Sequence, residues 1–97
     1  MKTSIVTLIQ FGEYVNSVPD NTFFLCINHK YDNEKRYIIY KNDEKCFEEF
    51  FDTNSKEELK IWMNLMGFNL LRNFLIKINH RDKFIIKYIM IELSKVS

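Results

Sequence analysis

Four side chains in the sequence could bind a soft metal ion such as zinc: Cys26, His29, Cys46 and His80. Cys26 and His29 form a C-x-x-H pair, but in a strand a separation of three residues places two side chains on opposite faces. Structural zinc sites generally combine two close pairs of ligands. We therefore predict that the chain binds no metal ion and no cofactor.

Residue types that carry out nucleophilic catalysis are present but isolated. The chain has no G-x-S-x-G motif and no glycine-rich phosphate loop. Cys46 has acidic neighbours, which oppose formation of a thiolate. The consecutive residues His80, Arg81 and Asp82 cannot easily converge on one atom, and their expected role is a polar connector. We predict that the protein is not an enzyme and has no small-molecule substrate.

The most one-sided charge lies in residues 42–58, NDEKCFEEFFDTNSKEE, with seven carboxylates against two lysines. On a helix over residues 43–52, the three phenylalanines would share one face and the acidic residues would form the other. That negative face is either a solvated surface or a platform for a basic partner. The acidic residues predicted to bind such a partner are Glu44, Glu48, Glu49, Asp52, Glu57 and Glu58.

Basic residues are concentrated at the end of the chain. Residues 72–97 have a net charge of +4, whereas residues 1–71 have a net charge of −3. The segment KRYIIYK interleaves basic and aromatic residues, so an exposed Tyr37 or Tyr40 could stack on bases or anchor a protein partner. The total charge of +1 does not by itself predict nucleic-acid binding.

Periodicity and turn chemistry predict the elements that position these residues. Residues 3–6 read as a short strand, and Thr7 can cap a helix that runs to about Ser17. Residues 22–41 contain two β-rich segments around a turn at Asp32 and Asn33, which predicts an antiparallel hairpin.

Further helices are predicted in the second half of the chain. Ser55 and Glu58 form the sequence of a capping box, for a helix that ends at Gly67. Residues 70–79 match a helical apolar pattern at nine positions of ten, against seven for a strand, which favours a helix. Residues 83–93 match both patterns equally and are either helix or strand.

Length and composition indicate one compact domain over residues 1–97. An apolar content of 46% argues against disorder. Two cysteines make no disulfide framework, and no signal peptide or membrane-spanning stretch is apparent. We predict a cytoplasmic protein with no membrane partner. The predicted fold is α+β, with the hairpin at about 22–41 covered by several helices and residues 83–93 as helix or strand.

This combination resembles the small anti-CRISPR and other anti-defence proteins of phages and mobile elements. The likeness lies in a short helix, a hairpin, acidic helices around NDEKCFEEFFDTNSKEE, an AT-rich compositional bias and the lack of a catalytic motif. It implies a non-enzymatic protein, and some proteins of this kind use acidic surfaces to occupy nucleic-acid channels. Residues 57–93 also resemble the helix, Gly-Phe, strand, turn, strand unit of CYTH triphosphate-tunnel enzymes, which implies strands after Gly67. The E-x-E-x-K signature of that family is absent.

We therefore predict a small binding protein whose acidic helical surface inhibits or regulates a larger, basic or nucleic-acid-binding protein. One alternative is a nucleic-acid-binding regulator that uses the basic C-terminal segment. Another is a homodimer that buries the apolar residues 84–93.

Overall fold

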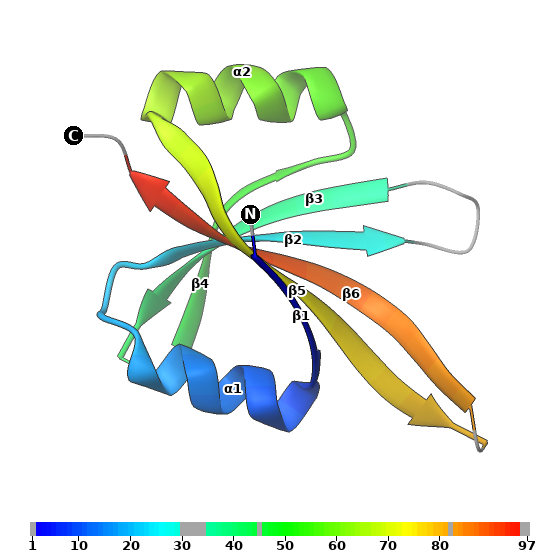
Figure 1. The fold of residues 1–97 in the computed structure, drawn as a ribbon. Helices are drawn as coiled ribbons and strands as arrows, with labels where there is room; N and C mark the ends of the chain where they lie inside the picture. Colours follow the sequence, from blue (N-terminus) through cyan, green and yellow to red (C-terminus); the bar gives the residue numbers. More distant parts are fainter. Residues whose placement is uncertain (1, 30–34, 45, 82, 96–97) are drawn as a thin grey trace.

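The computed structural model of the protein describes residues 2–29, 35–44, 46–81 and 83–95. Within these residues the chain forms six strands and two helices (Figure 1). In chain order they are β1 (Lys2–Thr7), α1 (Leu8–Ser17), β2 (Phe23–His29), β3 (Lys35–Asp43), β4 (Cys46–Thr53), α2 (Lys56–Met66), β5 (Phe68–His80) and β6 (Lys83–Lys95).

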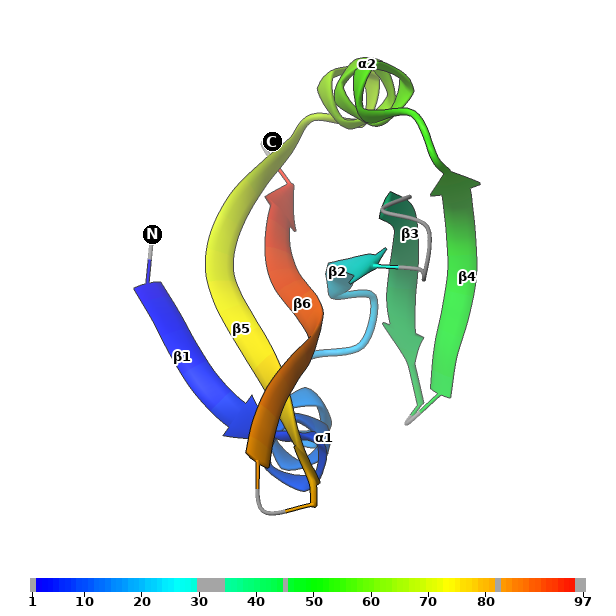
Figure 2. The same cartoon turned by 90° about the vertical axis from the view of Figure 1, so that its right-hand side faces the viewer.

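All six strands belong to one sheet, in the order β1-β5-β6-β2-β3-β4. β1 and β5 pair in parallel, and every other pair is antiparallel. Figure 2 shows the twisted sheet lying between the two helices, with α1 and α2 on opposite faces. The edges of the sheet are therefore β1 and β4.

Each helix covers its own apolar cluster. On one face, Phe11 of α1 meets the rings of Phe24 and Phe74 edge-on, with centroids 5.6 and 5.2 Å apart. On the other face, Leu59 of α2 packs in a cluster that includes the fully buried Ile39. Aromatic pairs of this geometry contribute about 0.5–1.5 kcal/mol beyond the apolar area that they bury.

Local sequence signals determine where the helices begin and end, as predicted. The Thr7 hydroxyl accepts a hydrogen bond from the Gln10 amide, and the Gln10 side chain accepts one from the Thr7 amide. Ser55 caps α2 with one hydrogen bond, accepted by its hydroxyl from the Glu58 amide, and Gly67 ends the helix in a left-handed conformation, with φ of 73°. The strand predicted at 3–6 and the hairpin predicted at 22–41 are also confirmed.

The predicted fold class, a hairpin at about 22–41 covered by several helices, is wrong. A single six-stranded sheet dominates the molecule, and the hairpin is only part of it. The helix predicted over residues 43–52 is also wrong, because Asp43 ends β3 and residues 46–52 lie in the edge strand β4. Residues 70–79, predicted as a helix, lie within β5, and residues 83–93, left open, lie within β6.

Each of these three strands carries a β-bulge, which contributes to the failed predictions. The extra residues are Phe50 in β4, Leu71 in β5 and Lys87 in β6. A bulge shifts the alternation of side chains by one residue, so the apolar pattern of the whole strand no longer has a period of two. The remaining spacing of three and four residues imitates a helix.

Candidate nucleic-acid interface

The β5–β6 hairpin extends beyond the rest of the sheet. β1 pairs with β5 only as far as Lys77, and β2 pairs with β6 only as far as Tyr88. Beyond these points, residues 78–80 pair only with residues 83–85, next to the pair of Lys77 and Ile86 and the bulge at Lys87. We call the described residues 78–81 and 83–87 the ribbon arm. At about 3.3 Å per residue, the arm is roughly 13 Å long, and Figure 1 shows it projecting at the lower right.

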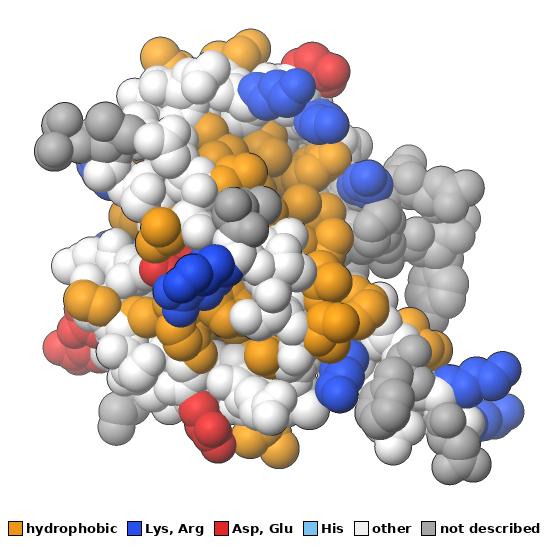
Figure 3. All heavy atoms as spheres, viewed as in Figure 1, with side chains coloured by type: hydrophobic (Ala, Val, Ile, Leu, Met, Phe, Trp, Pro, Cys, Tyr) orange, Lys and Arg blue, Asp and Glu red, His pale blue; other side chains and the backbone are white. Residues whose placement is uncertain are grey.

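Three exposed cations occupy the ribbon arm: Arg81 at its turn, and Lys83 and Lys87 on β6. Within the described part of the chain, none of them forms an ion pair with a carboxylate. Figure 3 shows blue basic side chains at this projecting end, while the red acidic side chains on the same face lie elsewhere. By sequence, residues 78–87 carry three cations and one carboxylate, Asp82, so this segment has a net charge of +2 on a protein with a total charge of +1.

Apolar side chains accompany these cations. Ile85 and Ile86 are consecutive residues of β6 and remain 48% and 45% exposed. They pair with Ile78 and Lys77 respectively, so they project from opposite faces of the arm. The segment predicted to form a homodimer, residues 84–93, is not apolar surface throughout. Its residues 90–93 are buried within the monomer.

The acidic residues predicted to share one surface are divided between the two faces of the sheet. Glu48 and Glu49 are consecutive on β4, so their side chains project to opposite faces. Glu48 lies 3.6 Å from the ammonium of Lys41, and Asp52 forms an ion pair with Arg36. This ion pair raises the pKa of the Arg36 guanidinium, mainly through the hydrogen bond to Asp52. β4 thus offers no continuous negative platform.

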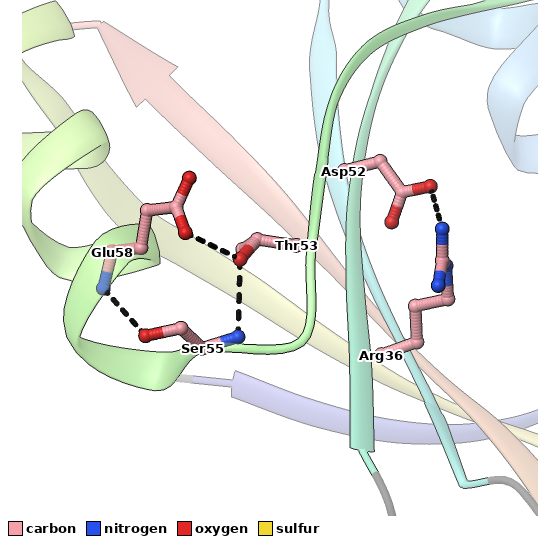
Figure 4. A network of polar contacts seen from close by, with 5 residues as sticks. All are labelled: Arg36, Asp52, Thr53, Ser55 and Glu58. Atoms are coloured by element: carbon pink, nitrogen blue, oxygen red, sulfur yellow. Dashed lines mark hydrogen bonds and ion pairs between the residues drawn. The ribbon is translucent and has the colours of Figure 1, made fainter.

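The two predicted acidic residues on α2 have different surroundings. Both residues are exposed, but the carboxylate of Glu58 also accepts a hydrogen bond of 3.0 Å from the hydroxyl of Thr53 (Figure 4). The same hydroxyl accepts one from the amide of Ser55, also over 3.0 Å. This contact replaces the second half of the predicted capping box, so Glu58 holds the start of α2.

The two tyrosines predicted as aromatic anchors are not equally accessible. Tyr37 is 6% exposed and belongs to the cluster beneath α2. Tyr40 is half-buried beside α1, and burial is the main cause that raises the pKa of its hydroxyl. Only Tyr40 keeps a partly open surface for a partner.

One predicted acidic residue, Glu44, lines a polar pocket of about 470 Å³. Asp20 lies beside it, and its Oδ1 accepts a hydrogen bond of 3.2 Å from the Glu44 amide. Asn42, which is 3% exposed, also lines the pocket, and its Oδ1 has no hydrogen-bond partner among the described residues. Val15 and Val18, at the negatively polarised end of α1, line it too. The pocket therefore favours a cation.

The candidate metal ligands do not assemble. Cys26 is buried, which raises the pKa of its thiol to about 11, whereas Cys46 is exposed at the start of β4. The side chains of His29 and His80 lie outside those described. Among the side chains that are described, no group of three His, Cys, Asp or Glu residues could hold a metal ion.

Comparisons with known proteins name no relative. No protein-family model matches the chain, and neither the curated proteins nor the solved structures include a significant match. Across the described residues, neither helix has the length and apolar character needed to cross a membrane.

Proposed function

We propose that the protein binds nucleic acid through the ribbon arm. The observation that supports this function is a projecting two-stranded ribbon with three exposed cations that no described carboxylate neutralises. Sequence reasoning kept this function as an alternative, because residues 72–97 are basic. The sequence does not indicate that Arg81, Lys83 and Lys87 lie on one projecting arm.

A two-stranded ribbon suits a duplex by its dimensions. The major groove of B-DNA is about 12 Å wide and admits such a ribbon. In this arrangement the cations contact phosphates along the groove walls, and Ile85 or Ile86 meets base edges. Three phosphate contacts give a slope of about −2.7 for log K against log salt, which is roughly a 40-fold loss of affinity between about 50 and 200 mM salt.

Fluorescence anisotropy with a labelled duplex, across a salt series, tests this function. The triple variant Arg81→Gln/Lys83→Gln/Lys87→Gln should bind more weakly and with a much flatter salt dependence. Lys56→Gln/Lys60→Gln is the control, because it removes two exposed cations from α2 and should bind like the wild type. If the wild type binds no duplex at low salt, or if the triple variant binds equally well, the proposal is wrong. A parallel series with single strands shows which form is preferred.

A second candidate function is binding of a basic protein, as an inhibitor or regulator. The helical platform predicted for this function is not formed, because residues 46–52 lie in strand β4. The pocket lined by Asp20, Asn42 and Glu44 favours the same function independently. An arginine or lysine side chain of the partner would enter the pocket and donate to Asn42 Oδ1.

Titration with an arginine-rich peptide, followed by NMR chemical shifts, tests the second candidate. Asp20→Asn/Glu44→Gln should weaken binding, while the charge reversal Glu48→Lys/Glu49→Lys tests whether the adjoining edge strand contributes. If the peptide perturbs no resonance at the pocket, or binds both variants as tightly as the wild type, this candidate fails.

A further inference from the structure

A second concave site lies on the opposite side of the sheet from α1. It is a groove of about 410 Å³ between α2 and the sheet, within the size range of ligand sites. Leu25, Ile27 and Ile91 form its floor, and Leu59 and Met63 of α2 form its wall. Figure 3 shows hydrophobic side chains exposed between α2, at the top of the view, and the strands below it.

The floor of the groove offers apolar surface and no free backbone groups. β2 and β6, which supply the floor, are interior strands with a partner on each side. Their amides and carbonyls are therefore used within the sheet. A peptide backbone lying here would lose its hydrogen bonds to water without replacement, which costs free energy, whereas an alkyl chain has no polar group to satisfy.

Polar side chains of α2 form one rim of the groove, and Tyr37 of β3 also lines it. Lys56, Lys60 and Asn64 follow one another at intervals of four residues along α2, and all three are exposed. At 1.5 Å per residue this rim is about 12 Å long. Neither lysine forms an ion pair with a described carboxylate. Lys56 also lies in the first turn of α2, where the helix dipole favours an anion.

The apolar surface continues beyond the groove. From Ile27 on β2, the pairing leads to Ile89, then Leu75, and then Ile5 at the edge of the sheet. Four strands in register at about 4.8 Å give this apolar row a length of roughly 14 Å. An elongated ligand therefore has a straight path from the lysine rim across the sheet.

We propose that this groove binds a single-chain amphipathic carboxylate, with its head group at Lys56 and Lys60 and its alkyl chain along Leu25, Ile27 and Ile91. The apolar floor, the use of its backbone groups within the sheet and the two rim lysines, which pair with no described carboxylate, all fit this ligand. The site shares no residue with the ribbon arm, so it stands or falls independently of nucleic-acid binding.

Calorimetric titration with octanoate, decanoate and dodecanoate measures the role of the alkyl chain. Each added methylene that enters the groove should tighten binding about fourfold. Decanol, which has the same chain without the charge, measures the contribution of the head group and should bind more weakly than decanoate. The fluorescence of the single tryptophan gives a second readout, because Trp62 stacks on the groove residue Phe68 with centroids 5.7 Å apart.

Two variants test the position of the ligand. Lys56→Gln/Lys60→Gln should lower the affinity for decanoate to that for decanol, and Asn64→Trp should obstruct the groove from an exposed position. Lys83→Gln/Lys87→Gln removes equal charge from the ribbon arm and should leave decanoate binding unchanged. The proposal is overturned if decanoate does not bind or does not distinguish the α2 variant from the wild type. The proposal would also be overturned if the groove bound an acidic helical peptide but none of octanoate, decanoate and dodecanoate.

Discussion

The hydroxyl of Tyr14, on α1, donates a hydrogen bond to Oε1 of Glu92, on the interior strand β6. Glu92 is only 8% exposed. Arg72 of β5 donates to the same hydroxyl over 3.2 Å, and its guanidinium lies 5.4 Å from the centroid of the Tyr14 ring. One tyrosine thus joins a helix to a buried carboxylate and an arginine on two neighbouring strands.

Replacing Tyr14 by Phe should destabilise the protein by about 1–3 kcal/mol, because the buried carboxylate of Glu92 loses its donor. Urea unfolding measures the difference. Tyr88→Phe is the matched control, since the Tyr88 hydroxyl is half-buried and forms no hydrogen bond with the described residues. Equal losses in the two variants would show that the Tyr14 contact contributes nothing specific.

Stability should also depend on pH through Tyr14. Burial, followed by the hydrogen bond and charge of Glu92, raises the pKa of Tyr14 from 10.0 to about 12. Because the folded value lies above the unfolded one, this contribution is complete below pH 10 and is lost as the pH rises towards 12. Unfolding at several pH values should show the wild type and Tyr14→Phe converging within that window. A constant difference would contradict the assignment.

The two glycines should respond to alanine in opposite directions. Gly67 has φ of 73°, so Gly67→Ala should cost roughly 1–2 kcal/mol. Gly12 lies inside α1, and a Cβ added there meets no atom within 4 Å, so Gly12→Ala should gain about 1 kcal/mol. Thermal unfolding of both variants measures the pair. A change of the same sign in both would refute the helix boundaries described above.

The two cysteines should differ in reactivity. Cys46 is exposed, whereas Cys26 is buried and burial raises its pKa to about 11. Iodoacetamide at neutral pH should therefore label Cys46 in the folded protein and Cys26 only after unfolding. Mass spectrometry of Cys46→Ser isolates the buried thiol. Rapid labelling of that variant under native conditions would mean that β2 is not held in the centre of the sheet.

The predicted and observed folds diverge at the three bulged strands. Helix α2 was predicted correctly, since Ser55 and Gly67 mark its ends by local chemistry. β4, β5 and β6 were missed or left open because Phe50, Leu71 and Lys87 each interrupt the alternation. A bulge is defined by two residues opposite one on the partner strand, so no window of a single strand contains the information.

The features of the candidate sites fall into the same two groups, those set by local sequence and those set by strand pairing. The two helix caps, the first hairpin and the basic charge of the C-terminal segment were predictable, because they depend on neighbouring residues and on composition. Only the tertiary structure separated Glu48 from Glu49, buried Tyr37, and gathered Arg81, Lys83 and Lys87 on one arm. Strand pairing decides which face a side chain occupies, and that pairing joins residues far apart in the sequence.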